Sequence, residues 1–275
     1  MLILPPQSSR LVTGDVILTL KREPSESFAA MIIDGPYGMN KGVWDATPFY
    51  PPNLIQESLR VLRDGGTAFV FGLPEILAQN WGVFPPNTRL LAWHYLNRPS
   101  SRPTFWCRSF DGIACFWKGD KPRFFADAVR TPYTQAYRRQ LGRRRPGTTG
   151  LYGAEDTVYR DLGGSAPRDV ITIPALAGGA GRKEGGLHVC QKPLALLRTL
   201  ILSCTEPGDI VGDIFAGSGS TSVAALELGR RFVAIEKDPA CISIAMQRLA
   251  NAESRPSTND GVPACGTPPS KPEEA

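Results

Sequence analysis

Short apolar runs and stretches with helical spacing alternate along this chain. Residues 28 to 33 (FAAMII) and residues 67 to 72 (TAFVFG) are mainly apolar, which is typical of strands buried on both faces of a parallel sheet. Between them, residues 51 to 63 carry apolar side chains at helical spacing behind two prolines, and residues 64 to 66 (DGG) are a turn signal. The alternation predicts a doubly wound α/β fold with helices on both faces of the sheet.

The same patterns continue to residue 250. We expect further strands at residues 89 to 96, 112 to 118, 209 to 214 and 231 to 236, and helices at residues 193 to 204, 219 to 228 and 239 to 250. Residues 251 to 275 are rich in Pro, Ser, Thr and Gly, so we expect a disordered tail. No run of 18 apolar residues and no export signal is found, which predicts a soluble, cytoplasmic protein without membrane contact.

Composition narrows the class of protein. A chain of 275 residues suits one large α/β domain or one domain with an insertion. Its six cysteines are scattered without a C-x-x-C pair, and it has only two histidines. These counts favour reduced thiols over a disulfide framework, and they argue against a zinc hydrolase, whose metal is usually held by two or three imidazoles.

The positive charge is concentrated in one segment. The chain has a net charge of +5, and residues 119 to 186 alone hold 12 Lys and Arg against 7 Asp and Glu. Within this segment, residues 130 to 145 contain two tyrosines, no acid and six arginines, namely Arg130, Arg138, Arg139, Arg143, Arg144 and Arg145. Arginine mixed with aromatic side chains suits phosphate and base contacts in nucleic acid. A solvated basic loop is the alternative that composition leaves open.

A glycine-rich turn, residues 213 to 221 (DIFAGSGST), separates a predicted strand from a predicted helix. Gly217 and Gly219 let the backbone approach a ligand closely, and Glu236 follows Gly217 by 19 residues, where a nucleotide-binding unit reads ribose hydroxyls. Ser222 stands where a dinucleotide fold has its third glycine, and a P-loop is absent. The Asp213 carboxylate would repel phosphate. The turn is therefore interpreted as a site for a cationic adenosine cofactor such as S-adenosylmethionine rather than as a purely structural turn.

A second turn, Asp34-Gly35-Pro36-Tyr37, directly follows the strand at residues 28 to 33. Ligands of open α/β sheets bind beyond the carboxyl ends of strands, so both turns should border one crevice. The Asp34 carboxylate and the Gly35 carbonyl could accept both hydrogens of a base amino group, Pro36 would stiffen the turn, and Tyr37 offers a stacking face. An ordinary strand-end turn is the alternative reading of the four residues.

Together these motifs resemble those of the β-type DNA amino-methyltransferases, in which a D-P-P-Y catalytic motif precedes the cofactor motif. The resemblance runs from Leu11 to Leu249 and includes Thr13-Gly14-Asp15 and residues 60 to 66 (RVLRDGG), 188 to 194 (HVCQKPL), 213 to 221 and 229 to 236 (GRRFVAIE). It implies a catalytic turn of Asp34, Gly35, Pro36 and Tyr37. It implies a cofactor site of Asp15, His188, Gln191, Lys192, Pro193, Asp213, Phe215, Ala216, Gly217, Ser218, Gly219, Ser220, Thr221 and Glu236.

Two positions depart from the family pattern. Gly35 replaces the first proline of the catalytic turn, and Val189 replaces the proline after His188. Glycine keeps the backbone carbonyl but removes the restriction on φ, so we expect slower catalysis rather than none.

The resemblance also implies an architecture. The sheet would be a circularly permuted, seven-stranded Rossmann-like methyltransferase sheet, with residues around 12 to 20 supplying the strand that follows Glu236. The expected units are a catalytic half (11 to 118), a basic target-recognition insert (119 to 186), a cofactor half (187 to 250) and the tail (251 to 275).

The implied reaction is site-specific methylation of double-stranded DNA on the N6 amino group of a flipped-out adenine. Cytosine N4 is an alternative target, because the Asp at the first motif position only favours adenine. A weakly active or inactive DNA-binding protein on the same scaffold is the second alternative, motivated by Gly35. Cytosine C5 chemistry is set aside because no Pro-Cys pair occurs. A restriction-modification context and a homodimer both fit the family, and the sequence decides neither.

Two further interpretations concern single residues. Arg138, Arg139, Arg143, Arg144 and Arg145 are the expected DNA contacts, and the last three should bind phosphates rather than read bases. Trp93, Trp106 and Trp117 are interpreted as core residues rather than as platforms for base stacking.

Overall fold

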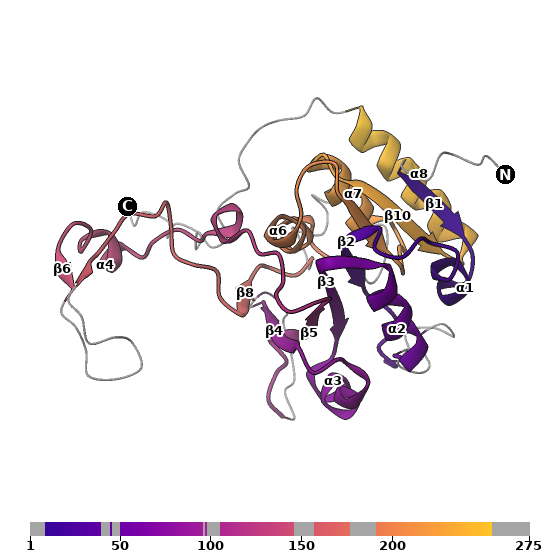
Figure 1. The fold of residues 1–275 in the computed structure, drawn as a ribbon, viewed down its shortest axis with the longest axis horizontal. Coiled ribbons are helices and arrows are strands. Elements are labelled where there is room, and N and C mark those ends of the chain that lie inside the picture. Colours follow the sequence, from indigo (N-terminus) through magenta and orange to yellow (C-terminus); the bar gives the residue numbers. More distant parts are fainter. Residues whose placement is uncertain are drawn as a thin grey trace, which may run out of the picture.

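The computed structural model describes residues 9–39, 45, 50–95, 97, 105–145, 157–176 and 191–254. One mixed sheet of eight strands runs through this part of the chain, and helices pack on both of its faces (Figure 1). The strands, in sheet order, are β1 (Arg10–Thr13), β10 (Arg231–Glu236), β9 (Ile210–Asp213), β2 (Phe28–Ile33), β3 (Leu62–Gly72), β5 (Phe110–Trp117), β4 (Thr88–His94) and β8 (Val170–Thr172).

The order of the strands is that of a permuted chain. β1, at the start of the described chain, pairs in parallel with β10 near its end, so that Thr13 lies opposite Glu236. β10, β9, β2 and β3 continue the parallel array. β5 is antiparallel to both β3 and β4, and β8 is parallel to β4. The carboxyl ends of β1, β10, β9, β2 and β3 therefore lie at one edge of the sheet.

Each face of the sheet buries its own apolar cluster. The helices are α1 (Val16–Leu20), α2 (Pro52–Val61), α3 (Pro74–Gln79), α6 (Leu194–Cys204), α7 (Ser220–Glu227) and α8 (Pro239–Glu253), with a short η2 (Trp81–Val83). The first three cover one face and the next three cover the other. Side chains of β2 alternate between the clusters, with Met31 and Ile33 in one and Ala30 and Ile32 in the other.

The doubly wound fold is confirmed, with three corrections. The sheet has eight strands rather than seven, because β8 adds to the edge beyond β4. The N-terminal strand ends at Thr13 and residues 16–20 form α1, because Asp15 caps a helix there. The expected turn at residues 64 to 66 lies inside β3, where Gly65 has a φ of +70° and the pairing with β2 shifts register.

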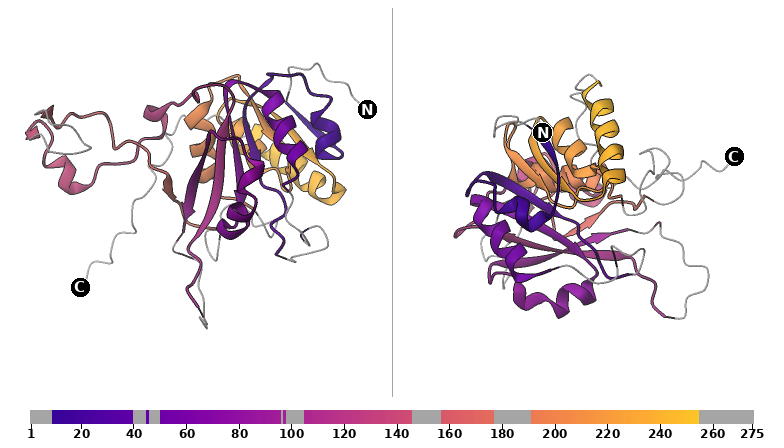
Figure 2. Two further views of the ribbon diagram at one scale, coloured as in Figure 1. Left: turned by 60° about the horizontal axis from the view of Figure 1, so that its bottom comes forward. Right: turned by 90° about the vertical axis from the view of Figure 1, so that its right-hand side faces the viewer.

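The basic segment leaves the sheet and returns to it. Its first part forms η3 (Ala126–Val129), which packs on α6, and its last part forms β8. Between them, the described residues 131–145 and 157–165 form what we call the arm. It contains α4 (Gln135–Arg138) and a hairpin of β6 (Arg144–Arg145) and β7 (Thr157–Val158), and it projects away from the sheet (Figures 1 and 2). A bridge between Thr131 and Ser165 closes its base.

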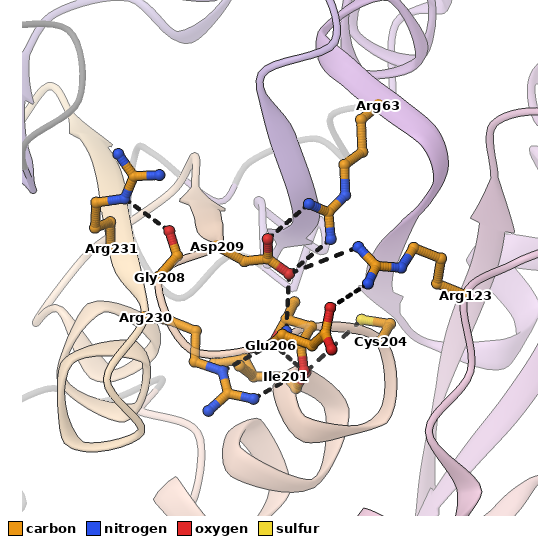
Figure 3. A network of polar contacts seen from close by, with 10 residues as sticks. Arg63, Arg123, Ile201, Cys204, Glu206, Gly208, Asp209, Arg230 and Arg231 are labelled. Atoms are coloured by element: carbon orange, nitrogen blue, oxygen red, sulfur yellow. Dashed lines mark hydrogen bonds and ion pairs between the residues drawn. The ribbon is translucent and has the colours of Figure 1, made fainter.

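A polar network joins the halves at the amino end of β9, opposite the edge where the parallel strands end. Both oxygens of Asp209 accept hydrogen bonds of 2.6 Å from Arg63 of β3 (Figure 3). Arg123, just before η3, forms ion pairs with Asp209 and with Glu206. The network thus connects β3, the basic segment and the loop between α6 and β9.

Two expectations concern parts of the chain at or beyond the described residues. The expected tail began at residue 251, but α8 continues to Glu253, and residues 255–275 lie outside the described chain. Among the described residues, every helix is too short or too polar to cross a membrane.

Candidate functional site

A cavity of about 680 Å³ opens at the edge where the parallel strands end. The turn after β2 (Asp34 to Tyr37) and the turn after β9 (Ile214 to Ser218) both line it, as does Glu236 at the end of β10. The two turns therefore border one crevice, as the strand pattern predicted. A cavity of this size falls within the range that holds a cofactor or a drug-sized ligand.

The turn after β9 owes its shape to two glycines. Gly217 and Gly219 have φ angles of +48° and +75°, in the left-handed region that favours glycine. A Cβ atom on Gly219 would lie 2.9 Å from the Cβ atom of Ala245 in α8. Arg248, also from α8, donates hydrogen bonds to the Ser218 carbonyl oxygen and to the hydroxyls of Ser218 and Ser220. Helix α8 thus supports the turn from beneath.

Asp213 ties this turn to the helix that follows. Its Oδ2 atom accepts hydrogen bonds from the Ser222 hydroxyl at 2.7 Å and the Ser222 N–H at 3.1 Å. Ser222 stands where a dinucleotide-binding fold has its third glycine, and its two hydrogen bonds fix Asp213 to the start of α7. Burial raises the pKa of the Asp213 carboxyl to about 6, against the lowering effect of the Ser222 hydrogen bonds. A cation entering the cavity would favour the ionised form of this carboxyl.

Glu236 and Asp15 already have backbone partners. Glu236 accepts a 2.8 Å hydrogen bond from the N–H of Gly217, and its other oxygen accepts from the N–H groups of Lys237 and Asp238. A carboxylate has about four acceptor positions, so a ribose hydroxyl can be added. Asp15 caps α1 through a 2.9 Å hydrogen bond from the Leu18 N–H and also lines the cavity.

Asp45 holds the turn after β2. Its carboxylate is 2% exposed and accepts hydrogen bonds from three successive N–H groups, those of Tyr37 (2.7 Å), Gly38 (2.9 Å) and Met39 (3.1 Å). Such a cradle fixes the backbone that carries the Asp34 side chain and the Gly35 carbonyl. Sequence reasoning missed Asp45, because only the folded chain brings its carboxylate onto these three N–H groups.

The Asp34 carboxylate has two donors. The Lys192 ammonium lies 2.6 Å from both Asp34 oxygens, and the Tyr37 hydroxyl donates to Oδ1 at 2.9 Å. Lys192 is buried and also lies over the rings of Tyr37 and Phe71, at 5.1 and 5.0 Å from their centroids. Burial, and next the charge of Asp34, raise the pKa of the Tyr37 phenol well above its usual range. Tyr37 therefore stays a neutral hydrogen-bond donor.

The two turns touch at Gly35. A Cβ atom at this position would lie 3.2 Å from the edge of the Phe215 ring, which belongs to the turn after β9. Gly35 does not have a left-handed φ. A larger residue at this position would therefore be hindered by the nearby Phe215 ring and not by backbone strain. A larger residue here requires the half-buried Phe215 ring to move by a few tenths of an ångström.

A third wall of the cavity comes from β4 and β5. Trp93, Tyr95 and Asp111 line it, and the Tyr95 hydroxyl donates to Asp111 Oδ1 at 3.0 Å. In the order of the strands, β4 and β5 lie on the other side of β2 from β9 and β10, so this wall and the glycine turn stand on opposite sides of Asp34, which follows β2. Sequence reasoning did not identify Tyr95 or Asp111, and it identified Trp93 only as a core residue; Trp93 is indeed buried, and it also lines the cavity.

Most of the expected site residues meet at this cavity. All four residues of the catalytic turn line it. The expected cofactor residues that line it are Asp15, Gln191, Lys192, Asp213, Phe215, Ala216, Gly217, Ser218, Ser220, Thr221 and Glu236. Gly219 and Pro193 do not line it; Gly219 is the N-cap of α7 and Pro193 is the N-cap of α6. His188 lies outside the described residues.

The expected DNA-contacting arginines lie on the arm, away from the cavity. Arg138, Arg139, Arg143, Arg144 and Arg145 are all exposed. The tyrosines of the arm pack on one another: Tyr133 stacks on Tyr137 at 4.6 Å, and Tyr159 meets Tyr137 edge-on at 5.5 Å. They form a small aromatic centre for the arm, and the guanidinium of the exposed Arg145 lies over the Tyr159 ring, 5.9 Å from its centroid.

Comparisons with known proteins agree with this geometry. The model of the N6/N4 DNA methylase family matches residues 29–247. The DNA adenine methyltransferase YhdJ of Escherichia coli K12 is 27% identical over 256 residues, which cover 88% of this chain and 83% of that protein.

Solved structures share the fold. A DNA modification methylase from Thermus thermophilus, TTHA0409, has a TM-score of 0.57 at 20% identity and covers 93% of this chain and 96% of that one. Its complex with S-adenosyl-L-methionine has a TM-score of 0.53 at 19% identity, covering 89% and 95%. The cytosine-N4-specific PvuII DNA methyltransferase has a TM-score of 0.59 at 16% identity, covering 88% and 86%.

Proposed function

The chain belongs to the N6/N4 family of DNA methylases, and we propose that it transfers a methyl group from S-adenosylmethionine to the N6 amino group of a flipped-out adenine in double-stranded DNA. The observation that carries this proposal is the single cavity that both turns line. It brings the acceptors for an amino group, Asp34 and Gly35, beside the glycine turn that suits an adenosine cofactor.

The residues around the glycine turn fit S-adenosylmethionine. Gly217 lets the backbone approach a ligand, and Glu236 stands beside it with acceptor capacity for ribose hydroxyls. Asp15 and Asp213 add carboxyl groups to the same wall, which suits a ligand with a sulfonium and an ammonium group. When bound, the cofactor supplies a methyl group activated by the positive charge on sulfur.

The residues of the catalytic turn would prepare the target nitrogen. An exocyclic amine is a poor nucleophile because its lone pair is delocalised into the ring. If the Asp34 carboxylate and the Gly35 carbonyl accept its two hydrogens, the lone pair is directed at the methyl carbon. The cofactor would supply the methyl group and keep the electron pair of the broken S–C bond, and Asp34 would accept the surplus proton from the methylated nitrogen and release it to solvent.

Lys192 shares Asp34 with the substrate. Its ammonium contacts both oxygens of Asp34, and the Tyr37 hydroxyl contacts one of them, so an incoming amino group takes the remaining acceptor position or replaces a Lys192 contact. The rings of Tyr37 and Phe71 lie about 5 Å from the ammonium, and they can hold the cation while the amino group takes its place. Lys192 thus keeps Asp34 compensated until substrate enters.

The arm supplies the DNA contacts in this proposal. Its described residues carry six arginines and one acid, Asp161, and all five arginines named above are exposed. Such side chains neutralise phosphates and fix the duplex in register without reading its sequence.

We propose adenine rather than cytosine as the target base for two reasons. The first residue of the catalytic turn is Asp, which favours adenine by resemblance, and YhdJ, a relative at 27% identity, is named a DNA adenine methyltransferase. The likeness to the PvuII enzyme is one of fold only, at 16% identity.

A radiolabel assay tests the proposal. Purified protein is incubated with methyl-labelled S-adenosylmethionine and unmethylated duplex DNA, and the DNA is digested to nucleosides. We expect label in N6-methyl-2′-deoxyadenosine for the wild type and none with Asp34→Ala. Asp120→Ala, which removes an exposed carboxylate outside the cavity, should behave as the wild type.

The outcomes separate the alternatives. Label in N4-methyl-2′-deoxycytidine would show that the target base is cytosine and not adenine. DNA binding without any transfer by the wild type would show instead a DNA-binding protein on a methyltransferase scaffold.

A further inference from the structure

Two large aromatic side chains in the connection between β4 and β5 are exposed to solvent. Phe105 is 81% exposed and Trp106 is 89% exposed, so the interpretation of Trp106 as a core residue is wrong. They follow one another in the chain, so two exposed rings lie at one point of the described surface. Single exposed apolar residues are common on protein surfaces, but a projecting aromatic pair marks a contact surface.

The pair belongs to the connection between β4 and β5, and this connection starts and ends at the cavity. Tyr95 precedes it and Asp111 follows it, and both line the cavity wall. Asn97 fixes its first part through paired hydrogen bonds of 2.7 and 2.8 Å with the backbone of Ala175. The chain that enters β5 extends beyond the rest of the sheet (Figure 2).

Its second part is also anchored. Arg108 donates to both carboxylate oxygens of Glu75 on α3, at 3.0 and 3.1 Å. Phe105 and Trp106 thus project just ahead of a fixed point rather than from a free end. An anchored aromatic pair loses little additional freedom when it binds a partner.

Charge indicates which partner fits. Residues 95 to 110 contain no acidic residue and three arginines: Arg108, which is paired with Glu75, and Arg98 and Arg102, which lie outside the described residues. Aromatic rings within an acid-free segment that carries surplus arginines match a polyanion that also offers flat faces for stacking.

We propose that Phe105 and Trp106 bind double-stranded DNA beside the target base, where their rings stack on the bases that flipping leaves unstacked. The proposal rests on the proposed function, because it needs DNA at the cavity mouth. Extrusion of a base costs stacking energy, and apolar side chains inserted at a base step can compensate for it. The arm then holds phosphates while this pair stabilises the opened duplex next to the cavity.

Fluorescence tests the contact directly. Quenching of tryptophan emission by acrylamide is measured with and without unmethylated plasmid DNA. We expect DNA to reduce quenching clearly more in the wild type than in Trp106→Phe, in which Trp93 of the cavity wall can still respond to DNA. Trp106 that stays equally accessible in the DNA complex would overturn the proposal.

Kinetics test the consequence. Trp106→Ala and Phe105→Ala should each raise the KM for DNA about tenfold and leave the affinity for S-adenosylmethionine unchanged, whereas Trp106→Phe should keep most of the wild-type activity. Phe124→Ala is the matched control, since Phe124 is 57% exposed and does not line the cavity. Equal effects of Phe124→Ala and Phe105→Ala would contradict the assignment.

Failure of the inference can be told from failure of the proposed function. If the wild type methylates DNA but the alanine variants keep its KM, only the inference fails. If the wild type transfers no methyl group, the proposed function fails, and the quenching experiment still reports on DNA contact. Sedimentation of the wild type as a dimer and of Trp106→Ala as a monomer would assign the pair to a subunit interface and overturn the proposal.

Discussion

The two turns at the edge of the sheet are built in different ways. The turn after β2 is held by side-chain contacts, because Asp45 accepts its N–H groups and Lys192 and the turn's own Tyr37 bind Asp34. The turn after β9 also has side-chain contacts, from Arg248 and Glu236. It depends in addition on backbone shape and close packing, because Gly219 has a left-handed φ and packs against Ala245 of α8.

This difference predicts how each turn fails. Loss of a single acceptor should disturb the geometry around Asp34 and reduce the rate of the chemical step. Added bulk in the glycine turn should weaken the cofactor site and the fold together. The four predictions below test this contrast, from the largest expected effect to the smallest.

Asp45→Ala should have the largest effect. It leaves three N–H groups of the catalytic turn without their acceptor, and we expect kcat to fall about 100-fold, equivalent to about 2.7 kcal/mol. The affinity for S-adenosylmethionine, measured by calorimetry, should change less than threefold. Asp45→Asn keeps one acceptor oxygen, so its kcat should lie between those of the wild type and Asp45→Ala. A kcat within threefold of the wild type for Asp45→Ala would show that the cradle does not matter.

Gly219→Ala should act on affinity and stability instead. Alanine at a left-handed φ costs about 1–2 kcal/mol, and its Cβ atom would also collide with Ala245. We expect about 2 kcal/mol lower unfolding free energy and a cofactor Kd raised at least tenfold. Gly229→Ala is the control, because Gly229 has a φ of +70° but open space around it. Gly229→Ala should lower the unfolding free energy only by the backbone cost of about 1–2 kcal/mol, and it should keep the wild-type Kd for the cofactor.

Asp213 should make stability depend on pH. Its pKa is about 6 in the folded protein and about 3.9 in an unfolded chain, so the folded state binds the proton more tightly. Lowering the pH from 7 to 4.5 should therefore raise the unfolding free energy of the wild type relative to that of Asp213→Asn, by on the order of 1 to 2 kcal/mol. Urea unfolding of both proteins at the two pH values measures this. A constant difference between them would rule the titration out.

Gly35→Pro should have the smallest effect, and it should be a gain. Proline would restrict the turn and stabilise it by about 0.4–1 kcal/mol, and we expect kcat to rise about twofold to fivefold. The Phe215 ring has to move slightly to admit the proline. If it cannot, Phe215→Leu in the same background should recover the gain. An unchanged rate in both variants would show that the freedom of Gly35 does not limit catalysis.

Much of the fold could be predicted because its signals are local. The strands β2 and β10 coincide with continuous apolar runs, and both turns follow a strand directly in the sequence. The helix α1 was missed, because Asp15 and the five residues that follow it are too short a signal. The strand β8 was missed for the same reason, since it has only three residues.

The contacts that complete the site could not be predicted. Lys192 and Asp34 are 158 residues apart, and only the fold brings them within 2.6 Å. Asp45 and Asp111 carry no motif of their own, so their roles depend on tertiary structure. Trp106 was misread because hydrophobicity is alike for a core residue and for an exposed contact residue.

The separation of the two turns can be tested most directly by calorimetric titration of S-adenosylmethionine into the Asp34→Asn variant. We expect a Kd within about threefold of the wild type, together with loss of methyl transfer to DNA, because Asp34 binds the target amino group and not the cofactor. A Kd raised thirtyfold or more would make Asp34 part of the cofactor site and would contradict the division of labour between the two turns.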